Sequence, residues 1–228
     1  MLTAEEWEAL RLSLLIAGRA AAFGLIFATA AGWLLARHRF WGRSLLDAVL
    51  HAPLILPPVV VGFVLLLLFG AQGLVGRWLD EAFGVRLVFN AAGASLAAGI
   101  MAFPLMLRAV RLALEAVDPR LEEAARSLGA GPWNCAFTIT LPLAWPGLVA
   151  AAVVGFAAAL GEFGAVITFA ANIPGETRTL PLAIYSAIQQ PGGEAAALRL
   201  SLISFAAALA ALLGSEALLR VGRRRAGR

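Results

Sequence analysis

Long apolar runs constrain this chain more than any other feature. Five of them are long enough for a helix to cross about 30 Å of hydrocarbon. With 61% hydrophobic and 14% charged residues, the chain is too apolar for a soluble domain of this length. The pattern therefore predicts an all-α, polytopic membrane protein with a single transmembrane domain over residues 1–228. The five predicted spans cover residues 10–36, 45–69, 91–112, 143–169 and 195–219.

The arginines predict how these spans are oriented, because basic residues gather in cytoplasmic loops. The first connection, the third connection and the C-terminal tail are arginine-rich, so the N-terminus is expected outside and the C-terminus inside. That arrangement needs an odd number of crossings and favours five spans over six. The stretch 180–188 is too short to span and is expected to form an outer or re-entrant helix; a sixth span is the alternative. The arginines assigned to the cytoplasm are Arg37, Arg39 and Arg43, then Arg108, Arg111, Arg120 and Arg126, then Arg220, Arg223, Arg224, Arg225 and Arg228.

The third connection, about residues 115–142, predicts two short helices joined by a sharp turn. Asp118 and Pro119 have the residue types of an N-cap followed by proline at the first helical position. Gly129 fits a C-terminal stop in the left-handed region, and Pro132 permits a new start. The first helix is amphipathic. Its apolar, small-residue face consists of Leu121, Ala124, Ala125 and Leu128, and its polar face of Glu122, Glu123 and Arg126.

The same loop carries an ordered motif: Glu123-Ala-Ala, three residues, Gly129, nine residues, then Ile139-x-Leu141-Pro142. This motif resembles the signature of membrane subunits of binding-protein-dependent ABC importers. In that family the loop is a coupling helix that sits in a cleft of a separate ATPase subunit. A plain amphipathic helix lying on the membrane is the simpler alternative, but it does not predict this order of residues. The resemblance implies that the ATPase-coupling residues are Glu122, Glu123, Ala124, Ala125, Leu128 and Gly129.

Two further segments narrow the resemblance. His51 to Pro58, and residues 160–165 continuing through 171–182, resemble molybdate permease subunits, and sulfate and thiosulfate permeases share part of them. The resemblance implies the type I importer permease fold and import of a tetrahedral oxyanion, molybdate and also tungstate, with sulfate or thiosulfate as the alternative. It also implies a multi-pass protein of a bacterial or archaeal cytoplasmic membrane. The implied partners are a second copy, membrane lipid, an external binding protein and two ATPase subunits that use ATP and Mg.

Prolines, glycines and one acidic residue in the apolar spans are candidates for the translocation path or its gate. Proline frees backbone carbonyls inside a membrane helix, which is tolerated beside protein or a watery cavity; a kink used only for packing is the alternative. A charge at the depth of Glu162 needs a partner, and Arg19 is expected at comparable depth, so an intramembrane pair is predicted. Contact of Glu162 with substrate is disfavoured by like-charge repulsion. The path candidates are Pro57, Pro58, Gly161, Glu162 and Gly164.

Several other functions find no support in the sequence. Every basic residue is arginine or histidine and none is lysine, so the phosphate-binding motif G-x-x-x-x-G-K-[ST] cannot occur, and ATP hydrolysis must belong to a partner. No His, Cys and carboxylate cluster has metal-ligand spacing, so we expect a transport subunit that is not an enzyme and binds no metal or cofactor itself. The arginines flank apolar spans, which argues against nucleic acid. An ATP-independent channel or scaffold would not need the signature loop, so the loop argues against this alternative.

Overall fold

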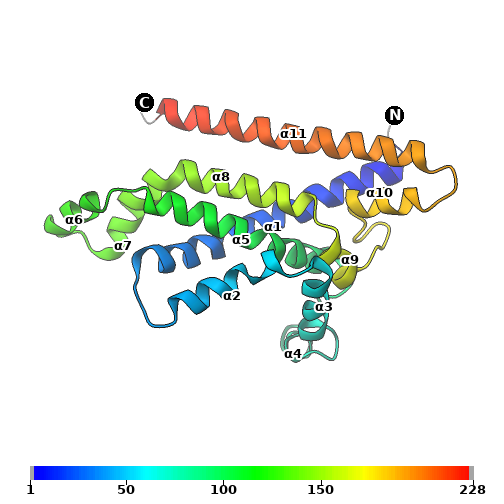
Figure 1. Cartoon of the computed structure of the whole chain (residues 1–228), viewed down its shortest axis with the longest axis horizontal. Helices are drawn as coiled ribbons and strands as arrows, with labels where there is room; N and C mark the ends of the chain where they lie inside the picture. Colours follow the sequence, from blue (N-terminus) through cyan, green and yellow to red (C-terminus); the bar gives the residue numbers. More distant parts are fainter. Residues whose placement is uncertain (1–2, 226–228) are drawn as a thin grey trace.

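The computed structural model describes residues 3–225, and the side chains of residues 3–214. Helices are the only regular secondary structure in the described part (Figure 1). Its helices are α1 (Ala4–Arg37), α2 (Arg43–Ile55), α3 (Pro58–Phe69), α4 (Leu74–Phe83), α5 (Ala91–Glu115), α6 (Pro119–Ser127), α7 (Pro132–Cys135), the π-helix η1 (Ala136–Thr140), α8 (Leu141–Leu160), α9 (Gly164–Ala170), α10 (Leu180–Ile188) and α11 (Glu194–Arg225).

The core is a bundle in which α5 packs between α1 and α8. Small residues let these helices approach closely. A Cβ atom at Gly24 of α1 or at Gly155 of α8 would overlap the side chain of Met106, which is fully buried on α5. The three long helices are therefore fitted to one another around Met106.

Four helices are long and apolar enough to cross a membrane: α1, α5, the run Pro132–Leu160 and the described part of α11. The second predicted span differs from the expected kinked helix. It breaks into α2 and α3, whose axes are bent by 114°. Pro57 caps α3 and Pro58 is its first residue, positions where the missing N–H groups cost nothing, whereas neither nitrogen can continue the hydrogen bonding of α2.

The fourth predicted span is also shorter than expected. Continuous helix ends at Leu160, and residues 164–170 form the separate helix α9. The predicted end at residue 169 is therefore wrong. Apolar composition alone could not show this break, because both sides of it are equally apolar. Helix α10 covers residues 180–188, the bounds predicted for a short helix.

The two ends of the bundle differ in what they carry. The connection between α1 and α2, helices α6 and α7, and the C-terminal end of α11 lie at one end, and the start of α1 and α10 lie at the other (Figure 1). Arg108 and Arg111 belong to α5, which corrects their assignment to the connecting loop. The side chains of Arg220, Arg223, Arg224 and Arg225, and the whole of Arg228, lie outside the described residues.

Candidate functional site

Residues 115–142 fold as the sequence predicts. The Asp118 carboxylate accepts a hydrogen bond from the N–H of Arg120 at 2.9 Å, and Pro119 is the first residue of α6. Gly129 has φ +87° and turns the chain after α6. Pro132 then begins α7. The segment is a helix, a sharp turn and a second helix, which we call the coupling segment (residues 118–135).

The coupling segment continues into the membrane without a break. Helix α7 passes into η1 and then α8, and the Leu141 N–H donates to the Ala136 carbonyl, the i→i−5 bond of a π-helix. Pro142 follows directly, and its ring would crowd the carbonyl four residues earlier in an ordinary α-helix. The wider turn accommodates that proline. Helices α7, η1 and α8 therefore form one continuous helical run from Pro132 to Leu160.

Glu122 is buried, with 5% of its surface exposed. Its Oε1 lies 2.7 Å from Arg37 Nη2 and accepts a hydrogen bond from Thr140 Oγ1 at 2.8 Å. Its Oε2 accepts from Arg126 Nη2 at 3.2 Å. Because these groups use both carboxylate oxygens, Glu122 faces inward and does not belong with the exposed residues predicted for ATPase contact. It holds α6 against the ends of α1 and η1.

The remaining predicted coupling residues lie on the outside of the segment. Glu123, Ala124 and Gly129 are exposed, Ala125 is half-buried, and Leu128 is 90% exposed. Leu121, Trp133 and Phe137 are exposed nearby, and the rings of the last two are stacked. Exposed apolar side chains gathered at one end of a molecule are typical of a protein-binding surface. We call the coupling-segment residues 121, 123–125, 128, 129 and 133, together with Phe137 of η1, the outer face of the coupling segment.

Two of the predicted path residues, Pro58 and Gly164, meet where α3 crosses α9. A Cβ at Gly164 would lie 2.7 Å from the Pro58 Cβ, and one at Gly62 would lie 2.8 Å from the Ala165 carbonyl oxygen. Both glycines therefore allow the two short helices to touch. Gly161 has no such role, because its nearest neighbours, the Ala157 and Ala158 carbonyl oxygens, would be 3.8 and 3.9 Å away.

Glu162 does not pair with Arg19. Its Oε1 accepts a hydrogen bond from the Ala165 N–H at 2.8 Å, so the side chain caps the first turn of α9. Arg19 is exposed on α1 and makes no ion pair with any described side chain. The prediction of a pair is wrong because comparable depth along two helices says nothing about which faces they present.

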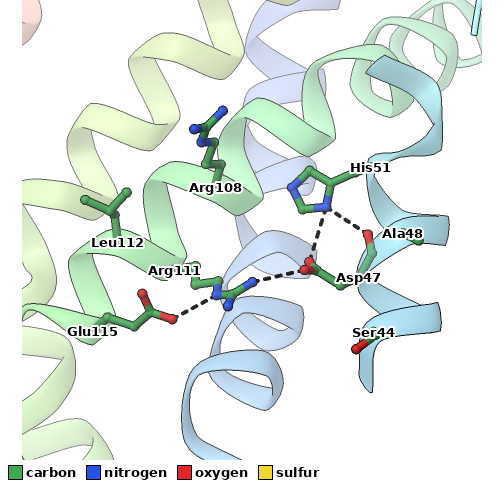
Figure 2. Close-up of a pocket in the computed structure, with 8 residues that line it drawn as sticks. All are labelled: Ser44, Asp47, Ala48, His51, Arg108, Arg111, Leu112 and Glu115. Carbon is green, nitrogen blue, oxygen red and sulfur yellow. Dashed lines mark hydrogen bonds and ion pairs between the residues drawn. The ribbon is translucent and has the colours of Figure 1, made fainter. Parts of the chain in front are cut away.

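A cleft between α2 and α5 was not predicted (Figure 2). Arg111 Nε donates to Glu115 Oε1 at 2.8 Å, and its Nη1 donates to Asp47 Oδ2 at 3.2 Å. His51 Nδ1 lies 2.8 Å from the Asp47 carbonyl oxygen. Polar residues four apart, at 47 and 51 inside the second predicted span and at 111 and 115 at and just beyond the end of the third, were the signal for a polar helix face. The cleft has a volume of about 520 Å³ and is lined by Ser44, Asp47, Ala48, His51, Arg108, Arg111, Leu112 and Glu115.

Comparison with known proteins agrees with this architecture. A model of the family described as binding-protein-dependent transport system inner membrane component matches residues 24–220. The molybdenum transport system permease protein ModB of Escherichia coli K12 is 56% identical over 228 residues, all of both chains. The sulfate transport system permease protein CysT of the same organism is 38% identical, over 96% of this chain and 79% of that one. An inward-facing MetNI methionine ABC transporter structure has the same fold, with a TM-score of 0.72, 18% identity, and coverage of 97% of this chain and 99% of that one.

Proposed function

We propose a function from the premise that this chain belongs to the family of inner membrane components of binding-protein-dependent transport systems. It is the permease subunit of a molybdate importer. The observation that carries the proposal is its 56% identity to a molybdenum permease over the full length of both proteins. It is a multi-pass protein of the inner membrane with one membrane domain over residues 1–228. It is a transport subunit and not an enzyme.

The family assigns ATP hydrolysis to a separate subunit and cargo capture to an external binding protein. ATP and Mg are therefore used by the partner, and this chain binds no cofactor of its own. The outer face of the coupling segment is the ATPase-docking surface. Its support is the exposure of Leu121, Leu128 and Trp133 at one end of the bundle, beside the signature residues Glu123, Ala124, Ala125 and Gly129.

The N-terminus lies outside and the C-terminus in the cytoplasm. Two observations support this orientation. The arginine-rich connection between α1 and α2 and the coupling segment share one end of the bundle with the C-terminal end of α11 (Figure 1), and basic segments prefer the cytoplasmic side. An ATPase can reach the coupling segment only from that side.

A second copy of the chain completes the path. Helix α3 is apolar on every side, as expected of a helix surrounded by protein or lipid. It bends away from the bundle by 114° relative to α2, so it does not run alongside the spanning helices. A symmetric partner would cover its outer surface. The exposed large hydrophobic residues of α3 are Val59, Val60, Phe63, Val64, Leu67 and Leu68.

The mechanism proceeds from the ATPase to the path. Closure of the ATPase moves the coupling segment, and the continuous helix from Pro132 to Leu160 carries that movement into the bilayer. The contacts of Glu122 with Arg37 and Thr140 make α1 and η1 move with α6. Helix α9, where it crosses α3, follows the end of α8 and is the element placed to open or close the outer side.

The test is uptake by proteoliposomes that contain the permease, its ATPase and the loaded binding protein. We expect ATP-dependent uptake of molybdate, and also of tungstate, which resists an equal concentration of sulfate. The 38% identity to a sulfate permease favours sulfate as the second candidate, and loss of molybdate uptake in modest sulfate would support it. Uptake without any ATPase would indicate a channel and contradict both.

A further inference from the structure

We propose that the cleft between α2 and α5 is an oxyanion site on the inner half of the transport path, with Arg108 as its free cation. The inference rests on the proposed function for the identity of the cargo. The ligand is a small divalent oxyanion, with molybdate as the cargo.

Arg108 is exposed and, within the described part of the chain, forms no ion pair. It lies seven residues before the end of α5, which places it about 10 Å along the helix from Glu115. At that depth an arginine facing lipid is costly, so such residues face water or a partner charge. Arg108 lines the cleft, which is large enough for water (Figure 2). The cleft is therefore a wet part of the membrane domain.

The other charges of the cleft neutralise one another. Arg111 is held between Glu115 and Asp47 at 2.8 and 3.2 Å. With Arg108 included, two arginines face two carboxylates. An anion at Arg108 is thus attracted by one free guanidinium and partly repelled by the carboxylates. Transport favours such a weak site, because cargo must leave as easily as it enters.

The end of the cleft opposite Arg108 carries groups that accommodate an anion as it passes (Figure 2). Ser44 lies in the first turn of α2, is exposed, and its hydroxyl has no hydrogen-bond partner among the described residues. Helix α2 begins after Gly42 without a side-chain cap; the Arg43 N–H donates to the Phe40 carbonyl, and the next two N–H groups have no partner among the described residues. Neutral His51 offers an anion no donor, because its Nδ1–H is directed to the Asp47 carbonyl oxygen and its Nε2 is then an acceptor. Arg108 is the expected ligand.

The cleft is large enough for a small oxyanion to pass through it. Its volume of about 520 Å³ exceeds many times the roughly 30 Å³ that one water molecule occupies in the liquid. A tetrahedral oxyanion can therefore enter with part of its hydration shell. The free-energy cost of complete dehydration is therefore avoided.

Binding is tested directly with a cysteine reporter at Leu112 in the purified complex. Leu112 is exposed, lines the cleft and lies one helical turn after Arg108 (Figure 2). The native Cys135 is buried and provides an unreactive background. We expect sodium molybdate to slow the reaction of Leu112→Cys with a neutral maleimide by about fivefold relative to sodium chloride at equal ionic strength. The protection should disappear in Leu112→Cys/Arg108→Gln and persist in Leu112→Cys/Arg39→Gln, which removes an exposed arginine outside the cleft. Equal labelling rates with and without molybdate, or protection that survives Arg108→Gln, would overturn the site.

Transport gives the second measurement. Molybdate uptake per ATP hydrolysed should fall about fivefold or more in Arg108→Gln, recover substantially in Arg108→Lys, and stay within about twofold of wild type in Arg39→Gln. Full uptake by Arg108→Gln would contradict the inference while leaving the proposed function intact. Failure of the wild-type complex to take up molybdate would instead reject the proposed function. The labelling experiment needs no transport and still decides whether the cleft binds the anion.

Discussion

The Nη2 atom of Arg37, at the end of α1, lies 2.7 Å from the Oε1 atom of Glu122, in the middle of α6. The two residues are 85 positions apart in the sequence, yet their side chains are only 16% and 7% exposed. The pair ties the coupling segment to the first membrane helix. Glu123, the residue after Glu122, is exposed, so the two adjacent glutamates face opposite ways.

Glu122→Gln is expected to destabilise the permease and to uncouple it. It leaves Arg37 without its counter-ion, and removing one member of a well-buried pair costs about 3–5 kcal/mol. We expect about 2 kcal/mol here, because glutamine still accepts from Thr140 and Arg37 is partly solvated. The thermal unfolding midpoint of the purified permease and the ratio of uptake to ATP hydrolysis would measure both effects.

The matched control is Glu123→Gln, which removes the same charge one residue later. It should leave the unfolding midpoint unchanged and weaken only the association with the ATPase. Equal loss of stability in both variants would show that the burial of Glu122 has no energetic consequence.

Leu128→Glu is expected to release the ATPase without unfolding the permease. Leu128 is 90% exposed, so the fold does not depend on it, but burial of a leucine in an interface contributes about 1.5–3 kcal/mol. Affinity for the ATPase should fall roughly ten- to a hundredfold, as measured by copurification or by titration of labelled subunits.

Leu74→Glu provides the comparison, since Leu74 is 82% exposed on α4, away from the coupling segment. Its affinity for the ATPase should equal that of wild type. If Leu128→Glu still retained the ATPase as tightly as Leu74→Glu does, the outer face would not be the docking surface.

Gly164→Ala is expected to disturb the crossing of α3 and α9. The new Cβ would lie 2.7 Å from the Pro58 Cβ, and forcing an extra methyl group into a packed contact costs about 1–3 kcal/mol. Gly161→Ala meets nothing closer than 3.8 Å and should be neutral. Comparing the unfolding midpoints and uptake rates of the two variants tests whether this crossing carries function. Similar behaviour of both would argue against it.

The sequence predicted the parts of the fold that depend on local chemistry. Asp118, Pro119, Gly129 and Pro132 specify the coupling segment through capping and backbone preference, and the long apolar runs located the spanning helices. It did not predict the inward direction of Glu122, because a helical face is polar whether it meets water or Arg37. The break between α8 and α9 was missed for a different reason: Gly161 and Glu162 interrupt the apolar run there, but the glutamate was interpreted as one half of an intramembrane pair.

The sequence and the structure assign different roles to Glu162. The sequence predicted that it pairs with Arg19, whereas in the structure it caps α9. If Glu162 caps α9 through the Ala165 N–H, Glu162→Gln keeps an acceptor oxygen and should be nearly neutral, whereas Glu162→Ala should cost about 1 kcal/mol, the usual effect of losing such a cap. Combining each with Arg19→Gln gives a double-mutant cycle in unfolding free energy. Because Arg19 has no contact with Glu162, the coupling energy should lie within about 0.5 kcal/mol of zero. A coupling well above that value, together with a damaging Glu162→Gln, would restore the intramembrane pair and require α1 and α9 to approach one another in the assembled transporter.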